Sequence, residues 1–319
     1  MQGNIMKSGI FRYLLSVVLI LCCAVLWVPE KGFAQYERPG SSAAQFLKLG
    51  VSAGVEGMSG IGVSTVKTAA AAYYNPAALA LIDGMDVTFT HTEWFAGINH
   101  EYISVAQNFG RSGTFALSAT GLYTNEMQVR TPLQPDGTGE TFYAGNFRAG
   151  LTYSRSLTNR VTFGGTINYI NVSLYDDFSE HAFSMDIASL YSTDYRGFAF
   201  GMKIANFGSN IKFVNESYPL PAFFEFGASM NAVEMGNQTM LVGFSAIKPN
   251  DGQPFGKFGV EWNAAGMLFI RGGYNIAHDT AEYTFGAGVE WGGFRVNYAF
   301  GNYRNIQPVH RFTLGMGLK

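Results

Sequence analysis

The sequence predicts an all-β protein, a closed antiparallel transmembrane β-barrel of roughly 14 strands with an N-terminal plug segment. Three observations predict this class. Apolar and polar residues alternate along segments of about ten residues, ionisable residues occupy the face opposite the bulky apolar ones, and short connections alternate with longer ones. Together they favour a barrel whose outer surface contacts lipid.

Alternation identifies the strands, because successive side chains of a strand point to opposite faces. Between Arg160 and Tyr169, bulky apolar residues occupy one parity and small or polar residues the other. A soluble β-sandwich also alternates, so this feature alone does not select a membrane barrel. The alternating segments are 86–95, 99–109, 113–124, 144–156, 159–172, 181–192, 196–206, 221–231, 238–247, 255–264, 266–276, 282–291, 293–301 and 308–318.

The position of the charged residues is more selective. A lumen tolerates ionic groups, whereas an Arg or Lys that faces lipid at mid-depth costs roughly 2 to 4 kcal/mol. In a soluble core such groups would be expensive, and on a solvated sandwich face they would be ordinary. We expect a luminal charge network among the residues on the less apolar parity: Arg148, Asp186, Lys203, Glu225, Glu261, Arg271, Glu290, Arg295 and Arg311.

Composition also favours a surface that does not face water. Charged residues make up 14% of the chain and aromatic residues 15%, which is too aromatic and too charge-poor for an average soluble domain. The formal net charge of −2 provides no basic surface for nucleic acid. Beyond the N-terminal region no apolar run reaches about 18 residues, so a barrel is the remaining way to cross a bilayer.

The connections show the rhythm of outer-membrane barrels, which have short periplasmic turns and longer external loops. The first external connection, at 96–98, is an exception because it is short. Such alternation is not expected of a β-sandwich. Tight turns are predicted at 110–112, 157–158, 194–195 and 292–293, and longer connections at 125–143, 173–180, 207–220 and 302–307.

The N-terminus has the pattern of a signal peptide: a basic start, an apolar run from Tyr13 to Val28, and small residues before Gln35. The run is short for a spanning helix. We expect a cleaved signal peptide at 1–34, a plug or hatch at 35–85 and a transmembrane barrel at 86–319.

Cleavage after Ala34 would remove both cysteines, Cys22 and Cys23, and with them any disulfide or thiolate metal site. A lipoprotein cysteine is the alternative reading. Leu21 disfavours it, because a small residue usually precedes a lipidated cysteine.

The segment before the first strand differs from the rest. Four glycines between Gly54 and Gly62 precede an Ala-rich stretch and then Asn75, Pro76 and Ala77. We interpret this as a flexible glycine stretch and a short helix that fold into the lumen as a plug. A short helix across the periplasmic end is the alternative.

The stretch from Phe46 to Leu81, with its Tyr-Asn-Pro-Ala-Ala-Leu-Ala element, resembles the N-terminal signature of the PorV/PorQ family of the FadL-like superfamily, which shares an Asn-Pro-Ala element in its hatch. The similarity extends over nearly the whole mature chain. It continues at 91–95, 101–102, 200–208, 219–221, 271–274 and 310–315.

This resemblance implies a fourteen-stranded outer-membrane barrel. It also implies a role in type IX secretion, in which PorV-like barrels accept cargo bearing a C-terminal sorting domain and pass it to other components of the system. One departure is the last residue, Lys319, where such barrels often end in Phe or Tyr.

No catalytic, metal or cofactor site is predicted. The five histidines are scattered, and His91 with Glu93 lacks the Cys-x-x-Cys of a zinc deaminase. Acidic residues at 176–180 form a solvated loop or, less favourably, a calcium site. Trp94, Trp262 and Trp291 are interpreted as interface girdle residues.

Two functions remain open, and a purely structural barrel with no cargo is a third possibility. One is an accessory of type IX protein secretion in the outer membrane, which binds cargo with C-terminal sorting domains. The other is a FadL-like passive transporter of hydrophobic small molecules, motivated by the hatch element and by Leu79, Leu81 and Ile82 at its end. The expected partners are outer-membrane lipid, cargo and secretion components, and no nucleic acid. A soluble secreted β-sandwich is the alternative to any membrane role.

Overall fold

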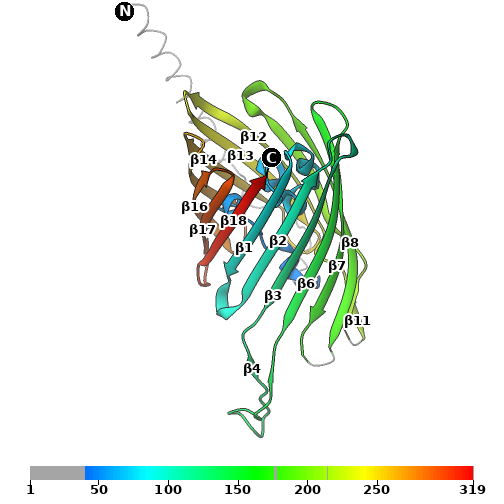
Figure 1. Ribbon diagram of the computed structural model, residues 1–319. Coiled ribbons are helices and arrows are strands. Elements are labelled where there is room, and N and C mark those ends of the chain that lie inside the picture. The colour runs from blue at the N-terminus through cyan, green and yellow to red at the C-terminus, as the bar shows by residue number, and fades with distance from the viewer. Residues whose placement is uncertain (1–39, 176–177, 214, 319) are drawn as a thin grey trace, which may run out of the picture. The chain divides into compact units, whose positions relative to one another are not determined.

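The computed structural model describes residues 40–175, 178–213 and 215–318 (Figure 1). The predicted signal peptide lies outside these residues. Among the described residues, no helix combines the length and the apolar character needed to cross a bilayer.

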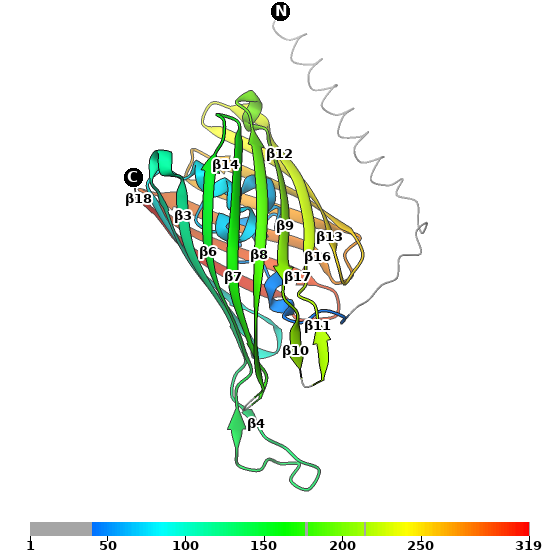
Figure 2. The same cartoon turned by 90° about the vertical axis from the view of Figure 1, so that its right-hand side faces the viewer.

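Fourteen of the described strands close into one antiparallel barrel, so the predicted fold class is confirmed (Figures 1 and 2). Each strand pairs with its neighbours in chain order, and β1 pairs with β18 to complete the ring. The barrel strands are β1 (Met85–Glu93), β2 (Asn99–Asn108), β3 (Thr114–Tyr123), β6 (Gly145–Ser156), β7 (Val161–Ser173), β8 (Ser179–Ser192), β9 (Ala199–Gly208), β12 (Phe223–Met235), β13 (Gln238–Pro249), β14 (Phe255–Ala264), β15 (Leu268–Ile276), β16 (Ala281–Trp291), β17 (Phe294–Tyr303) and β18 (Val309–Leu318).

Each predicted segment overlaps one barrel strand, and the differences lie in the connections. The loops predicted at 125–143 and 207–220 contain small hairpins, β4 (Met127–Gln128) with β5 (Thr141–Phe142) and β10 (Ile211–Phe213) with β11 (Glu216–Tyr218). β12 also runs beyond the predicted end at 231, because a register shift between Asn231 and Val233 lets it stay paired with β13.

The two faces of the barrel differ in chemistry. Along β1, Asp86, Thr88, Thr90 and Thr92 are buried inside, and β7 and β8 alternate in the same way. A sheet with an apolar outside and a polar inside suits a barrel in lipid. Exposed outward residues include Phe89, Ile103, Leu117, Leu151, Ile167, Phe183, Ile187, Ile204, Phe244, Ile270, Phe285, Val296, Phe312 and Leu314.

The longer connections lie at one end of the barrel. The β4–β5 hairpin projects from the lower rim in Figure 1, and the β10–β11 hairpin lies at the same end in Figure 2. The first connection on this side is short, as expected, and holds η3 (Phe95–Gly97). We call this rim the long-loop end and the opposite one the short-turn end, where η4 (Gly110–Ser112) and η5 (Tyr195–Gly197) lie.

Residues 41–84, called here the luminal segment, lie inside the ring of strands (Figure 2). They begin at the long-loop end and reach β1 at the short-turn end. The sequence predicted a flexible glycine stretch followed by one short helix. The structure instead has short helices in the glycine stretch as well, and they are largely buried. The helices are η1 (Gln45–Lys48), α2 (Ala53–Glu56), α3 (Gly62–Thr65), α4 (Ala71–Tyr74) and η2 (Pro76–Leu81).

Two glycines allow the close approach of this segment to the wall. A Cβ on Gly57 would lie 2.9 Å from the Cα of Gly286 on β16, and a Cβ on Gly201 of β9 would lie 2.0 Å from the carbonyl oxygen of Val63. Real Cβ atoms do not come so close to backbone. The segment and the barrel therefore pack backbone against backbone at these points.

The apolar outer face gives a first testable prediction. Leu117 lies midway along β3 and is 65% exposed on the outside. Leu117→Arg should destabilise the barrel in lipid by about 2 to 4 kcal/mol, because the charge must leave water. Tyr195→Arg in the short-turn rim is the control and should change the unfolding free energy little. Denaturant unfolding in bilayers measures both, and equal costs would contradict a lipid-facing β3.

Candidate functional site

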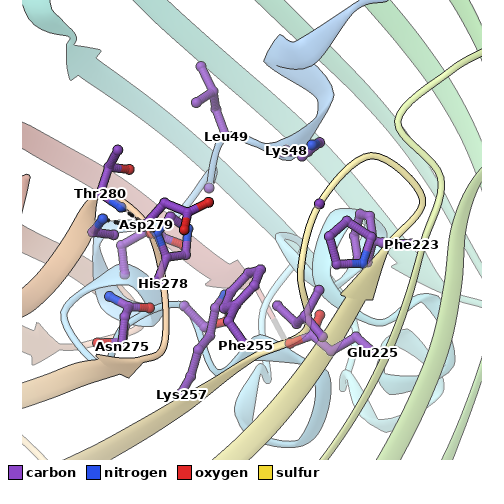
Figure 3. Close-up of a pocket in the computed structure, with 18 of the residues that line it drawn as sticks. Lys48, Leu49, Phe223, Glu225, Phe255, Lys257, Asn275, His278, Asp279 and Thr280 are labelled. Atoms are coloured by element: carbon purple, nitrogen blue, oxygen red, sulfur yellow. Dashed lines mark hydrogen bonds between the residues drawn. The ribbon is translucent and has the colours of Figure 1, made fainter. Parts of the chain in front are cut away.

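A cavity of about 450 Å³ opens at the long-loop end (Figure 3). Its floor is the luminal segment, and its walls come from β9, β12–β18 and the loops after β13 and β15. Polar and apolar side chains share the lining, as Figure 3 shows for Phe223, Phe255 and Lys257. The site is therefore a mixed pocket of a size suited to one small molecule.

Aromatic rings and cations meet in this pocket. The ammonium nitrogen of Lys203 lies 4.9 Å from the ring centroid of Tyr73 and 5.1 Å from that of Phe223. It also donates a hydrogen bond to the backbone carbonyl of Tyr73. Arg311 stacks in the same way, with its Cζ 5.5 Å from the ring of Trp94. These cation–π contacts hold both cations at the apolar wall.

The charges of the pocket are incompletely paired. Arg311 Nη1 lies 4.0 Å from a carboxylate oxygen of Glu56, and Lys257 Nζ donates to the carbonyl of Gly60 at 3.3 Å. The Oε1 atom of buried Glu225 has no hydrogen-bond partner among the described residues. The pocket can therefore offer apolar contacts and charged or polar contacts to the same ligand.

A clasp of four residues closes one side of the pocket. The carboxylate of Asp251, in the loop after β13, accepts hydrogen bonds from Ser42, from Gln45 Nε2 at 2.7 Å and from Lys48 Nζ at 2.7 Å. Burial raises the pKa of Asp251, but hydrogen bonds from Lys48, Ser42 and Gln45 outweigh it and lower the pKa overall. The clasp therefore joins the start of the luminal segment to the rim.

The clasp gives a prediction about pH. Because the pKa of Asp251 is lowered in the folded protein, its contribution to stability is present at neutral pH and is lost as pH falls below the ordinary carboxyl range. Limited proteolysis near residue 45 should be slow at pH 7 and faster at about pH 3. Asp251→Asn should show the fast rate already at pH 7, whereas exposed Asp279→Asn in the neighbouring loop should not. Equal rates for both variants would contradict the clasp.

The structure pairs some of the nine predicted luminal residues with each other. Arg148 Nη2 lies 3.3 Å from Asp186 Oδ2, and Arg271 Nε lies 2.6 Å from Glu261 Oε2. Arg148 and Asp186 are almost completely buried. These two pairs lie on the inner face of the barrel, and none of their four residues lines the pocket.

The remaining predicted residues have other neighbours. Lys203, Glu225 and Arg311 line the pocket. Arg295 faces Glu290 in register but forms its ion pair with Asp86, at 2.5 Å. The sequence pattern did not indicate Glu56, Asp86 and Asp251 as ionic partners. For Asp86 a signal existed, because it alternates in step with Thr88 and Thr90 and so shares their face of the strand.

The Asn-Pro-Ala element ties the luminal segment together. Asn75 donates from Nδ2 to the carbonyl of Val63 at 2.5 Å and to that of Ser189 on β8 at 3.3 Å. Its Oδ1 accepts from the backbone N–H of Ala77 at 3.0 Å, which caps η2, and Pro76 occupies the first turn. Asn75 therefore connects α3, η2 and the wall.

Two sequence interpretations change. Trp94 is not a girdle residue, because alternation after Thr92 turns it inward onto Arg311, whereas Trp262 and Trp291 are exposed. His91 pairs with Glu101 at 2.6 Å on the outer face, away from the pocket. In the described part of the chain, no group of three or more His, Cys, Asp or Glu residues is placed to hold a metal ion.

No protein-family model and no curated protein matches the sequence. Solved structures do match. The CymD monoaromatic hydrocarbon channel has a TM-score of 0.56 and 11% identity, with 84% of this chain and 98% of that one covered. The toluene transporter TodX of Pseudomonas putida has a TM-score of 0.50 and 13% identity over 79% of this chain and 94% of that one.

A FadL homologue of Pseudomonas aeruginosa has a TM-score of 0.51 and 8% identity, with 91% of this chain and 100% of that one covered. At these identities the similarity shows the fold alone. The barrel therefore shares its fold with these proteins, two of which are named as a channel and a transporter.

Proposed function

We propose that this chain is an outer-membrane channel, not an enzyme, that admits small hydrophobic or amphipathic molecules passively, with the luminal segment as its plug. The observation that carries the proposal is the pocket of about 450 Å³ at the long-loop end, with aromatic rings and cations above a floor formed by that segment. Long loops face outward in such barrels, so the pocket would face the environment.

The similar structures support this proposal at the level of fold, because two of them are named as a hydrocarbon channel and a toluene transporter. The pocket adds a reason of its own. Tyr73, Phe223 and Phe255 provide apolar contact area, while Lys203 and Lys257 can meet a polar head. A ligand bound there would have to displace part of the luminal segment in order to pass.

Uptake by proteoliposomes tests the proposal, with a neutral monoaromatic hydrocarbon and a medium-chain fatty acid as the two probes. Uptake above that of empty vesicles is expected for at least one probe. Phe223→Ala should weaken binding of the transported probe by about tenfold, or ~1.4 kcal/mol, because a buried aromatic contact is lost. Phe285→Ala on the lipid face is the matched control. No uptake of either probe would overturn the proposal.

A second candidate is the type IX secretion accessory, within the PorV/PorQ family that the sequence resembles. The favouring observation is the β4–β5 hairpin, which projects beyond the long-loop end and carries Leu133 at 94% exposure (Figure 1). Because the hairpin projects from the rim, a partner could contact it without entering the lumen. Its partners would be cargo proteins with C-terminal sorting domains and other secretion components.

Genetics tests this second candidate. Deletion of the gene should reduce surface delivery of proteins with C-terminal sorting domains, and a copy that lacks residues 125–143 should fail to restore it. A copy with Phe285→Ala should restore delivery in full. Unchanged delivery in the deletion strain, with any paralogue also removed, would exclude this role.

A further inference from the structure

A hollow in the outer face of the barrel lies over β3 and β6, on the side toward the viewer in Figure 2. Strand register places Ala119 of β3 directly opposite Ala149 of β6, between Ile103 on β2 and Tyr169 on β7. Two small side chains in a row of large ones leave a groove of about 480 Å³, called here the outer hollow. Its apolar margins are the exposed side chains of Ile103, Leu117, Leu151, Ile167 and Phe183.

The outer hollow lies near the middle of the bilayer. Arg155 is six residues beyond Ala149 on β6 and shares its outer face. Six residues of strand extend about 20 Å, and a tilt of about 40° reduces this to ~15 Å of depth, half of the roughly 30 Å hydrocarbon core. When the hollow is at the mid-plane, Arg155 is therefore at the membrane surface on the short-turn side.

Aromatic rings mark the level between the hollow and that surface. The ring centroids of Phe109 and Phe115 lie 5.9 Å apart, and those of Phe115 and Tyr153 lie 4.9 Å apart. The hydroxyl of Tyr153 donates to the carbonyl of Ser112 in η4 at 3.2 Å. Such rings are typical of the membrane interface. An acyl chain that leaves the outer hollow along β6 therefore passes Tyr153 on its way to the short-turn rim.

The rim below the hollow is basic. Arg111, Arg155 and Arg160 are exposed there, and among the described residues none of their guanidinium groups has an ion pair or a hydrogen bond. Arg111 and Arg155 line one cleft of about 340 Å³, and no acidic residue is part of its lining. These arginines are therefore available to an anion from the membrane surface.

This positive charge is confined to the side that carries the hollow. Asp83 and Asp194, in the connections before β1 and after β8, form no ion pair with these arginines in the described part of the chain. The short turns between β12 and β17, at 235–237, 265–267 and 292–293, contain no Lys or Arg. The basic rim and the outer hollow thus coincide on β2, β3, β6 and β7.

Together the two features match the two parts of one lipid. Exposed arginines alone would need no ligand, but these continue the strands that form the hollow. A guanidinium group binds phosphate through its fork of N–H donors, whereas the hollow offers only apolar contact at the depth of an acyl chain. A rim with net positive charge favours a headgroup with net negative charge over a zwitterionic one.

We propose that one anionic phospholipid of the leaflet at the short-turn end binds to this outer face. Its phosphate lies at Arg155 and Arg111, and one of its acyl chains runs past Tyr153 into the hollow between Ala119 and Ala149. The short-turn end is periplasmic in barrels of this kind, so the lipid belongs to the periplasmic leaflet.

Native mass spectrometry of the detergent-purified protein tests the site. The protein is titrated with phosphatidylglycerol or with phosphatidylcholine of the same acyl chains, so that only the headgroup differs. One phosphatidylglycerol should be retained, with a preference of about thirtyfold over phosphatidylcholine, the effect expected of two basic residues at an anionic lipid. Equal retention of the two lipids would overturn the proposal.

The role of the arginines is tested by single substitutions. Arg155→Gln should lower the preference for phosphatidylglycerol about fivefold. Arg196→Gln removes the same charge from the exposed β8–β9 turn, away from the hollow, and should leave the preference unchanged. An equal loss in both variants would mean that anionic lipid collects diffusely around the rim, which contradicts a defined site.

The role of the hollow is tested by filling it. Ala149→Phe should lower the retention of both lipids, and Ala287→Phe, on the exposed outer face of β16, should behave like the parent. Heat-modifiable gel migration confirms that each variant folds. Unchanged retention in Ala149→Phe would overturn the proposal. A parent dimer that this variant dissolves would also overturn it, because a second copy would then occupy the hollow.

The lipid site depends on the outer surface and not on the lumen. The pocket proposed to admit hydrophobic molecules shares no residue with the outer hollow or with the basic cleft. Uptake of the hydrocarbon or fatty-acid probe and retention of phosphatidylglycerol can therefore fail separately.

Discussion

Replacement of Gly201 by valine is expected to open the barrel to hydrophilic solutes. The Cβ would lie 2.0 Å from the carbonyl oxygen of Val63 and 2.9 Å from Nδ2 of Asn75. The new side chain would therefore clash with the backbone of the luminal segment and with Asn75, which connects α3 to η2. The wall at this point is fixed by pairing of Gly201 with Leu190 and Gly227. The luminal segment must therefore move, at an overpacking cost of about 1 to 3 kcal/mol.

Swelling of proteoliposomes in raffinose measures this effect, and proteolysis between residues 41 and 84 should accelerate in parallel. Gly272→Val on β15 is the matched control, because a Cβ there meets no atom within 4 Å. It should neither leak nor become more sensitive to protease. A Gly201→Val barrel as tight as the parent would mean that the luminal segment does not obstruct the lumen.

Asp186→Ala is expected to be the most destabilising of the substitutions considered. Its carboxylate accepts from Arg148 at 3.3 Å, from Asn168 Nδ2 at 3.2 Å and from the backbone N–H of Asn206 at 2.7 Å. The β8–β9 register shifts beside Asp186, and Asn206 has a φ of 58°. The carboxylate therefore accepts a hydrogen bond from a backbone N–H that strand pairing leaves without a partner. Removal leaves a buried guanidinium without its counter-charge, at a cost of about 3 to 5 kcal/mol.

Guanidinium unfolding in detergent micelles measures this cost. The control is Glu282→Ala, which removes the partner of Arg304, 61% exposed, and should cost about 0 to 1 kcal/mol. A double replacement of Arg148 and Asp186 by leucine should cost less than Asp186→Ala alone, since no charge is left unpaired. If Asp186→Ala and Glu282→Ala cost the same, the buried pair does not contribute as inferred.

Strand placement followed from local pattern. Along β7, Phe163, Ile167 and Tyr169 alternate with Thr166 and Asn168, and any register that buries one parity exposes the other. Ion pairing did not follow from local pattern. Glu290 and Arg295 sit opposite each other across a two-residue turn, yet Arg295 binds Asp86, which is brought beside it by closure of β18 onto β1.

The pocket shows the same division. Phe223, Lys257 and Arg311 are far apart in the chain, and no spacing in the sequence relates them to the pocket they share. Their proximity depends on the order of strands around the ring and on the path of the luminal segment. Alternation after Thr92 already placed Trp94 inward, but its contact with Arg311 depends on closure of β18 onto β1.

By itself, the sequence determined that this chain forms a closed β-barrel of fourteen strands with an apolar outer face, because strand alternation is a local property of neighbouring residues. Only the tertiary structure decided which charges pair and where the pocket lies. Those features depend on contacts between residues distant in the chain, and ring closure and register create such contacts only in the folded state.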